Sequence, residues 1–236
     1  MLPFLTFGFL AEILASSVGF GASTILLPLS LLYFDFKTAL TLVAIFHLFG
    51  TLSRSYLFRA GLNRKVLLQF GLPSILFGII GALLSSHLTQ TLLKQLLGLF
   101  LIFYGSFSLL KRDLKLKPTL PNLIFGGGIS GILAGLIGTG GALRATFLSS
   151  FKSKKAEYLA TTAVIALTVD LTRIPVYLNQ GFLSPKFFIT IPFLFMTALI
   201  ATFLGKQVAN RLPTQLFEKI VLLAIIAAGF FFLVHP

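Results

Sequence analysis

Residues 135–150 read GLIGTGGALRATFLSS, so that glycines at 138, 140 and 141 are closely followed by Arg144. Such glycines leave backbone polar groups uncovered, and hydrocarbon tolerates neither these groups nor an arginine without a compensating partner. Yet the surrounding chain is 56% hydrophobic and 11% charged over 236 residues. A soluble domain of this size cannot bury so much apolar surface, and the composition therefore predicts a polytopic membrane protein.

Charge and cysteine usage exclude several classes of function. The net charge of +13 would indicate a nucleic-acid partner in a soluble protein, but the Lys and Arg residues mostly lie between apolar runs, where they set orientation in a bilayer. We expect no nucleic-acid partner, no cofactor and, without cysteine, no thiolate chemistry. The sequence has no GxxxxGK[ST] loop, which argues against direct ATP drive by this chain. Glu12 interrupts the first apolar run, which we interpret as a retained membrane helix rather than a signal peptide.

The apolar runs fall into two sets of five. We expect a first repeat over residues 1–112, a linker at 113–120 and a second repeat over 121–236. The first repeat contains runs at 4–18, 22–34, 38–58, 66–86 and 91–110. The second contains runs at 121–137, 142–150, 157–178, 186–208 and 214–234. One offset of 119 residues places Gly19 on Gly138, Gly21 on Gly140 and Arg54 on Arg173, which indicates an internal duplication.

In each half, the first two runs are shorter than the roughly 20 residues that a spanning helix needs. We expect them to form hairpins, 4–34 and 121–150, that enter the membrane and return to the side they came from. Each half then has three full crossings, an odd number, so the halves are inverted. The predicted fold class is an all-α polytopic membrane protein with two inverted repeats, each a Gly-tipped short-helix hairpin plus three full transmembrane helices.

The distribution of Lys and Arg supports hairpins over bent spans. With hairpins, 12 of these residues lie on one side of the membrane and 3 on the other (Lys37, Lys94 and Lys186), whereas bent spans would divide them 8 to 7. Positive residues collect on the cytoplasmic side. We therefore predict a multi-pass protein of the cytoplasmic membrane with both termini extracytoplasmic.

Paired, Gly-interrupted apolar segments in two inverted halves point to the substrate site of a transporter. The helix N-termini that follow the tips favour an anion, and nearby hydroxyl groups can donate hydrogen bonds to it. The candidate substrate-binding residues are Gly19, Gly21, Ser23, Thr24, Gly138, Thr139, Gly140, Gly141, Arg144, Arg54 and Arg173. For a second glycine series, Gly127, Gly131 and Gly135, we prefer close helix packing because the spacing of four forms a small-residue face.

The buried charges leave alternatives open. Arg144 either binds an anion or pairs with a carboxylate, Arg54 can snorkel from the end of its helix, and Asp170 can neutralise Arg173 three residues later. Glu12, His47 and Asp170 are candidates for carrying a coupling proton. The alternative for His47 is a structural hydrogen bond between helices.

Two motifs carry a resemblance to a known family. GFGASTILLPLSLLY (19–33) and GTGGALRATFLSS (138–150) resemble the Gly-rich motifs of the TauE/SafE family of sulfite exporters, and the likeness extends over essentially the whole chain. The first motif keeps Pro28-Leu29 but has Ala22 and Ser23 where the family often has glycine. The second has Phe147 in place of the proline and gains Arg144. The resemblance implies export of a small sulfur-containing anion across the cytoplasmic membrane.

The sequence thus predicts a secondary transporter rather than an enzyme, moving sulfite or an organosulfonate, with proton coupling and a homodimer as compatible additions. One alternative is a passive anion channel, which would share the site and lack coupling. The other is a rhomboid-like serine protease, because GISG (128–131) fits a GxSG motif. That enzyme needs a later histidine as base, and the sequence offers only His235, at its extreme C-terminus.

Overall fold

The computed structural model describes residues 1–18, 22–57, 61–110, 116–151, 153–208 and 214–235, and within these ranges the side chains of 17–18, 208 and 214–218 are not described. The described part is helical and contains no strand. The first half comprises α1 (Leu2–Val18), α2 (Ala22–Ser30), α3 (Phe36–Leu57), α4 (Arg64–His87) and α5 (Gln90–Leu110). The second comprises α6 (Leu120–Ile137), α7 (Gly140–Ser150), α8 (Lys155–Asn179), the 3-10 helix η2 (Pro185–Thr190), α9 (Ile191–Val208) and α10 (Thr214–Val234).

In the described part of the chain, six helical stretches are long and apolar enough to cross a membrane, which agrees with the predicted class. Five contain or nearly match predicted spans: α3, α4, α5, α8 and Pro185–Gln207. The sixth is α6, which the sequence assigned to a hairpin; its 18 residues reach the length of a span. The predicted span 214–234 corresponds to α10, of which Lys219–Val234 counts as a shorter apolar helix among the described residues.

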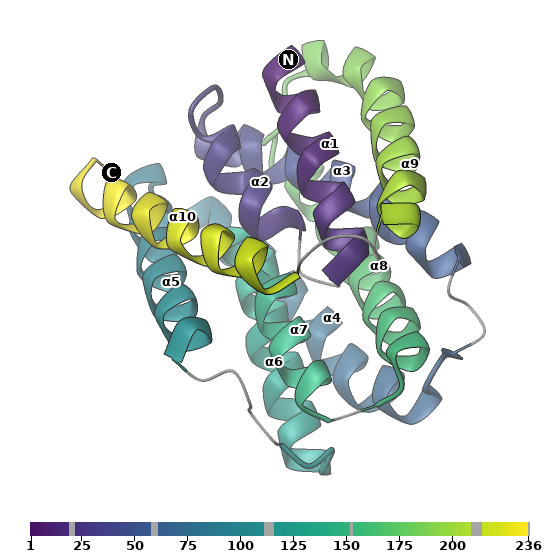
Figure 1. Ribbon diagram of the computed structural model, residues 1–236. Helices are drawn as coiled ribbons and strands as arrows, with labels where there is room; N and C mark the ends of the chain where they lie inside the picture. Colours follow the sequence, from purple (N-terminus) through teal and green to yellow (C-terminus); the bar gives the residue numbers. More distant parts are fainter. Residues whose placement is uncertain (19–21, 58–60, 111–115, 152, 209–213, 236) are drawn as a thin grey trace.

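The two short helices of each half fold back on one another. Gly126 of α6 packs against Phe147 of α7, and Gly140 at the start of α7 packs against Ser130, so the two helices are antiparallel. In the first half, the rings of Phe4 in α1 and Phe34 just after α2 lie 5.8 Å apart. In Figure 1, α1 descends to the middle of the molecule, α6 rises to it, and α2 and α7 return outward. Passage of these hairpins into and out of a bilayer stays a prediction.

The turn of the second hairpin depends on Gly138. This residue ends α6 in the left-handed conformation, with φ 73°, which glycine adopts at little cost. Its N–H donates to the Ala134 carbonyl at 3.2 Å, and the Thr139 N–H donates to the Leu133 carbonyl at 3.3 Å. The chain can therefore reverse without leaving all of the last α6 carbonyls unpaired.

Equivalent helices of the two halves pack antiparallel. In the α3–α8 contact, His47 touches Asp170, while Asn63, beyond the end of α3, touches Thr161 near the start of α8. Numbering therefore rises along one helix as it falls along the other. A two-fold axis along the membrane normal would leave equivalent helices parallel, whereas an axis in the membrane plane makes them antiparallel. The inverted repeat itself remains a prediction, with which this packing agrees.

The α5–α10 contact repeats itself when the halves are exchanged. Gly105 packs against Leu222. Gly229 packs against Gly98. An offset of 124 residues places Gly105 on Gly229 and Gly98 on Leu222, so the second contact is the first with the two halves exchanged. A matched pair of contacts at one offset is the result expected from two copies of one ancestral unit.

The glycines at 127, 131 and 135 form the packing face that their spacing predicted. A Cβ atom at these positions would collide with the carbonyl oxygens of Phe70, Ser74 and Gly78 respectively, all in α4. The prediction of close helix packing is thus confirmed. The contact lets the α6 and α4 backbones approach each other directly, which anchors the second hairpin.

This interface gives a stability prediction. We expect Gly135→Ala to lower the free energy of unfolding by about 1–3 kcal/mol, because a methyl group at this position overpacks the helix contact. Gly128→Ala is the matched control, since its Cβ would meet only the Phe77 ring at an ordinary 3.4 Å. Thermal unfolding in detergent measures both variants. Equal melting temperatures for the two would contradict the assignment of Gly135 to packing.

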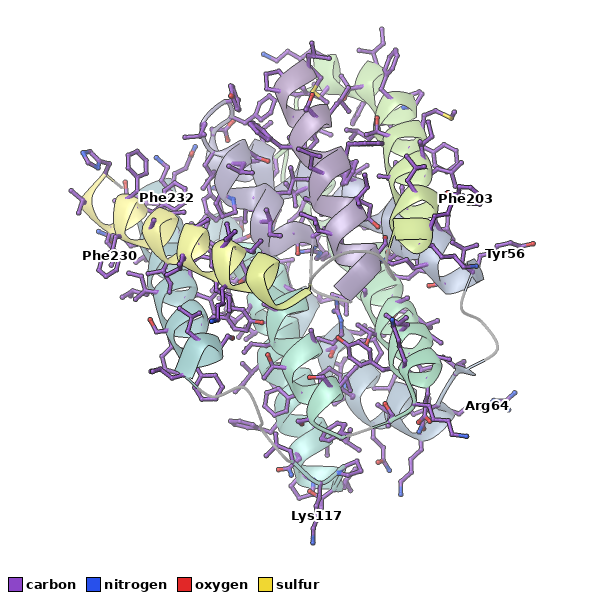
Figure 2. The ribbon with its side chains drawn as sticks, viewed as in Figure 1. Tyr56, Arg64, Lys117, Phe203, Phe230 and Phe232 are labelled. Atoms are coloured by element: carbon purple, nitrogen blue, oxygen red, sulfur yellow. The ribbon has the colours of Figure 1, made fainter. Side chains whose placement is uncertain are left out.

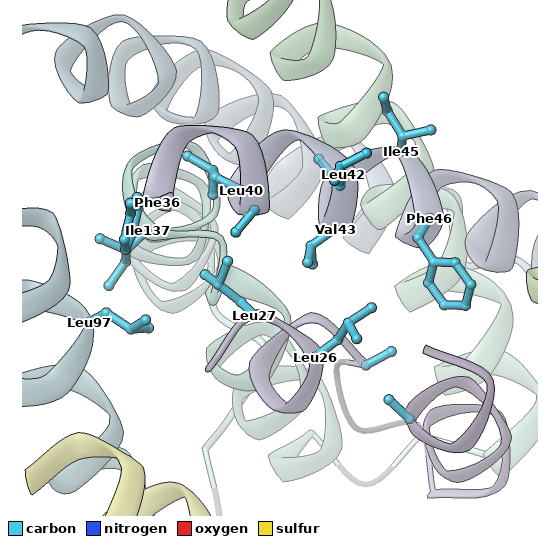
Figure 3. Packing of buried hydrophobic residues seen from close by; sticks show 14 of the residues in the cluster. Leu26, Leu27, Phe36, Leu40, Leu42, Val43, Ile45, Phe46, Leu97 and Ile137 are labelled. Carbon is cyan, nitrogen blue, oxygen red and sulfur yellow. The ribbon is translucent and has the colours of Figure 1, made fainter. Parts of the chain in front are cut away.

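The largest cluster of buried apolar side chains holds α2 against α3. Leu26 and Leu27 face Leu40 and Val43, and Ile137 from the end of α6 lies beside Phe36 (Figure 3). The second hairpin tip is therefore seated on helices of the first half. This packing brings the N-termini of α2 and α7 to the same region of the molecule.

Candidate functional site

The site lies where the second hairpin tip meets α2 and α3. A Cβ atom on Gly138 would lie 2.9 Å from Leu40 and 3.0 Å from Leu27, and α2 contacts α7. Of the predicted tip residues, Ser23 and Thr24 lie in the first turn of α2, and Gly140 and Gly141 in the first turn of α7; all four are buried. Gly19 and Gly21 lie outside the described residues.

Two threonines of the tip region, Thr24 in the first turn of α2 and Thr139 just before α7, have buried hydroxyls without a partner among the described residues. The Oγ1 atoms of Thr24 and Thr139 are buried and form no hydrogen bond within the described part of the chain. Thr139 precedes α7 as its N-cap, but its side chain makes no capping bond. Buried hydroxyls are normally hydrogen-bonded, and an unpaired one indicates that a ligand or water completes it.

Arg144 is a buried charge without an ion pair. The side chain is 4% exposed, and its Nε atom has no hydrogen-bond partner in the part of the chain that is described. No carboxylate among the described residues lies within ion-pair distance of it. It interacts electrostatically, over longer range, with Asp170, Arg173 and Arg54. Two alternatives were predicted for Arg144, anion binding and pairing with a carboxylate. Among the described residues, Arg144 has no direct pairing with a carboxylate.

Asp170, on α8, is fully engaged. Its Oδ1 accepts from Arg173 Nε at 2.9 Å and lies 2.8 Å from the second guanidinium nitrogen, while its Oδ2 lies 2.7 Å from His47 Nδ1. His47 thus links α3 to α8, as the structural alternative for this residue anticipated. Asp170 pairs with Arg173 three residues later, as the sequence allowed.

Arg173 also reaches the end of the hairpin. It donates through a terminal nitrogen to the Ala134 carbonyl near the end of α6. Tyr177, one helical turn later on α8, donates to the Gly135 carbonyl. The last carbonyls of α6 carry the negative end of its dipole, so a guanidinium and a phenol at this point stabilise the hairpin where it turns.

Glu12, on α1, forms the counterpart cluster. Its Oε1 accepts from Thr202 Oγ1 on α9 at 2.9 Å and from Ser16 Oγ at 3.2 Å, and Arg54 Nε lies 3.6 Å away. Its Oε2 is buried and without a partner among the described residues. Gly50 leaves the space for this carboxylate, because a Cβ there would lie 2.5 Å from Oε1. Arg54 is 8% exposed and therefore buried rather than snorkelling.

The buried charges do not balance. Among the described residues, three guanidinium groups, from Arg54, Arg144 and Arg173, are buried with two carboxylates, from Glu12 and Asp170. Arg54 and Arg173 have carboxylate partners, and Arg144 is left over. With His47 neutral, these five groups sum to one positive charge. An uncompensated charge at this depth is costly, and a bound anion would remove the imbalance.

Sequence reasoning missed two members of these clusters. Tyr177 could have been found, because it follows Arg173 by four residues on the same helical face. Thr202 could not have been found, because it lies 190 residues from Glu12 in the sequence and its neighbours in the sequence are apolar. Gly140 has a structural part as well, since its contact with Ser130 closes the hairpin.

The comparison with protein families now bears on this geometry. The model described as sulfite exporter TauE/SafE matches residues 4–232. The chain belongs to the TauE/SafE family. No curated protein and no solved structure matches it. The family resemblance found in the two Gly-rich motifs is thus confirmed, and the chain is a multi-pass membrane protein of a transporter family.

The family assignment also bears on the protease alternative raised by the GISG segment (128–131). In this TauE/SafE chain, Ser130 donates its hydroxyl to the Gly127 carbonyl at 3.1 Å, and its own carbonyl is covered by Gly140. Gly131 packs on Ser74 of α4. Ser130, Gly131 and Gly140 therefore have packing roles in the hairpin. The family is one of transporters rather than proteases.

Proposed function

We propose that this TauE/SafE chain is a secondary transporter that exports a small anion, sulfite or an organosulfonate, across the cytoplasmic membrane. The observation that supports this most directly is Arg144, a buried guanidinium with no carboxylate partner among the described residues. It lies four residues, about one turn, after Gly140 at the start of α7, and the dipole of this helix adds to the attraction for an anion near its N-terminus.

In the proposed complex, Arg144 offsets the charge of the anion and donates hydrogen bonds to its oxygens. The hydroxyls of Thr24 and Thr139 and the backbone N–H groups of Gly140 and Gly141 complete the binding. Sulfite and sulfonates present three oxygens around one sulfur, which suits donors that converge from two helix N-termini.

Arg54 and Arg173 act on the anion at longer range in this mechanism. Each already has a carboxylate partner, and Arg173 also holds the end of α6. Their charges raise the positive potential at the site while their contacts fix the α1 and α6 ends of the hairpins. Alternating access then consists of rocking of one part of the bundle against the other around the tips.

Glu12 is the group best suited to carry a coupling proton. Both Asp170 oxygens are occupied by Arg173 and His47, so protonation of Asp170 would break an ion pair. Glu12 has a buried Oε2 without a partner among the described residues, and protonation there leaves the hydrogen bonds to Oε1 in place. Its ion pair with Arg54 is the longer one, at 3.6 Å against 2.8 Å for Asp170 and Arg173, so its neutralisation costs less. His47 would then have a mainly structural part, as a bridge between α3 and α8.

The test is radiolabelled sulfite flux in proteoliposomes, with and without an imposed pH gradient. We expect flux through the protein that rises several-fold with a gradient in the coupling direction, and loss of that rise in Glu12→Gln. Flux that ignores the gradient in the unaltered protein would favour the passive channel. Absence of sulfite flux would overturn the proposed substrate and turn the measurement to a panel of sulfonates and carboxylates.

A further inference from the structure

A small pocket opens at the end of the molecule where α7 ends and where α4 and α8 begin. Its volume is about 180 Å³. Leu148 and Phe151 line it from α7, Glu157, Tyr158 and Thr161 from α8, and Asn63 from the start of α4. No part of the site described above includes this pocket, so its role is a separate question.

Hydrogen bonds fix the polar wall of the pocket. Asn63 donates through its side-chain nitrogen to Glu157 Oε1 at 2.5 Å and through its backbone N–H to Thr161 Oγ1 at 3.0 Å. The same side chain caps α4 by accepting from the Val66 N–H at 3.0 Å. The Glu157 carboxylate is therefore held against the wall by Asn63.

The pocket floor lies one helical turn from Arg144. Leu148 follows Arg144 by four residues on α7, a rise of about 6 Å along the same helical face. Tyr158 lines the pocket and also interacts electrostatically with Arg144. Two lining residues, Leu148 and Tyr158, are thus the ones that lie toward Arg144.

Leu148 and Tyr158 belong to a cluster of apolar side chains at this end of the molecule. Leu148 is 4% exposed and belongs to a compact cluster with Phe70, Leu123 and Ile165. Tyr158 and Phe151 pack against this cluster. The cluster is separate from the main core around α2 and α3, so it can rearrange without unpacking that core.

The pocket opens among basic residues. Arg64, Lys117, Lys154 and Lys155 are exposed and lie next to lining residues in the sequence. Figure 2 shows Arg64 and Lys117 pointing away from the lower end of the molecule. Exposed positive charges near a depression raise the local concentration of anions, and the one lining carboxylate, Glu157, is hydrogen-bonded to Asn63.

We propose that this pocket is the mouth through which the anion travels between the basic end of the molecule and Arg144, with Leu148 and Tyr158 as the gate. The inference rests on the proposed function, since it assigns a route to the same substrate. By the distribution of Lys and Arg, this mouth opens to the cytoplasm, where an exporter takes up its substrate.

The absence of cysteine from the sequence permits a direct test by single-cysteine labelling. Ser153 lines the pocket and is exposed, so Ser153→Cys can be labelled in detergent with a bulky anionic maleimide before reconstitution. A thioether label is required because sulfite cleaves disulfides. The control is Leu110→Cys at the end of α5, which is 84% exposed and lies neither among nor next to the residues that line the pocket.

We expect the label on Ser153→Cys to reduce sulfite flux at least 10-fold, and the label on Leu110→Cys to change it less than 2-fold. If unlabelled Ser153→Cys transports sulfite and the label leaves that flux intact, the mouth is elsewhere and the proposed function stands. Equal inhibition at both positions would also overturn the assignment. If the unaltered protein carries no sulfite, the proposed function fails, and the route falls with it.

Discussion

Arg144→Ala is expected to reduce sulfite flux about 100-fold in proteoliposomes, with the protein still folded. Removal of one partner of a buried charge pair costs about 2–5 kcal/mol, and the lower part of this range corresponds to that loss of binding. Arg144 makes no ion pair within the described part of the chain, so its removal strands no buried carboxylate. The melting temperature in detergent should stay the same or rise.

Two further variants sharpen this test. Arg144→Lys keeps the charge and loses the planar fork, so we expect partial flux with a raised KM. Arg64→Ala removes an exposed positive charge at the start of α4. We expect this variant to change sulfite flux only a few-fold. Full sulfite transport by Arg144→Ala would remove the central charge from the proposed site, whatever the behaviour of the other two.

The sequence was informative about features that depend on local spacing. The spacing of Gly127, Gly131 and Gly135 predicted a close helix contact, because a repeat of four puts small residues on one helical face, and the structure identifies α4 as the partner. The break in spacing at Gly138 predicted the reversal, because a left-handed residue ends a helix. Both signals lie within a few residues of chain and need no knowledge of distant partners.

Contacts between distant helices were beyond such reasoning. His47 and Asp170 are 123 residues apart, and spacing alone could not show that they meet while Arg144 stays without a partner. The sequence allowed the Asp170–Arg173 pair, which lies within α8. The contact of His47 with Asp170 came only from the packing of α3 against α8, as did the absence of an ion pair for Arg144 among the described residues.

The pairing of Asp170 with Arg173 leads to the second large effect. Asp170→Asn should lower the free energy of unfolding by about 3–5 kcal/mol, because it leaves the buried Arg173 guanidinium without its carboxylate. Arg173 is 2% exposed and cannot reach water without breaking its bond to the Ala134 carbonyl. Loss of that bond would release the end of α6 and disturb the hairpin tip, so sulfite flux should fall together with stability. Thermal unfolding in detergent and sulfite flux measure the two effects.

The double variant Asp170→Asn/Arg173→Gln separates a structural role from a coupling role. If Asp170 only neutralises Arg173, removal of both charges should recover more than half of the lost stability, since two neutral amides can hydrogen-bond in the same place. Gradient-driven flux should then return in part, because Glu12 still carries the proton. If Asp170 itself carries the proton, the double variant will fold and melt near the unaltered protein but ignore the pH gradient. A single Asp170→Asn variant as stable as the unaltered protein would contradict the ion-pair argument at its first step.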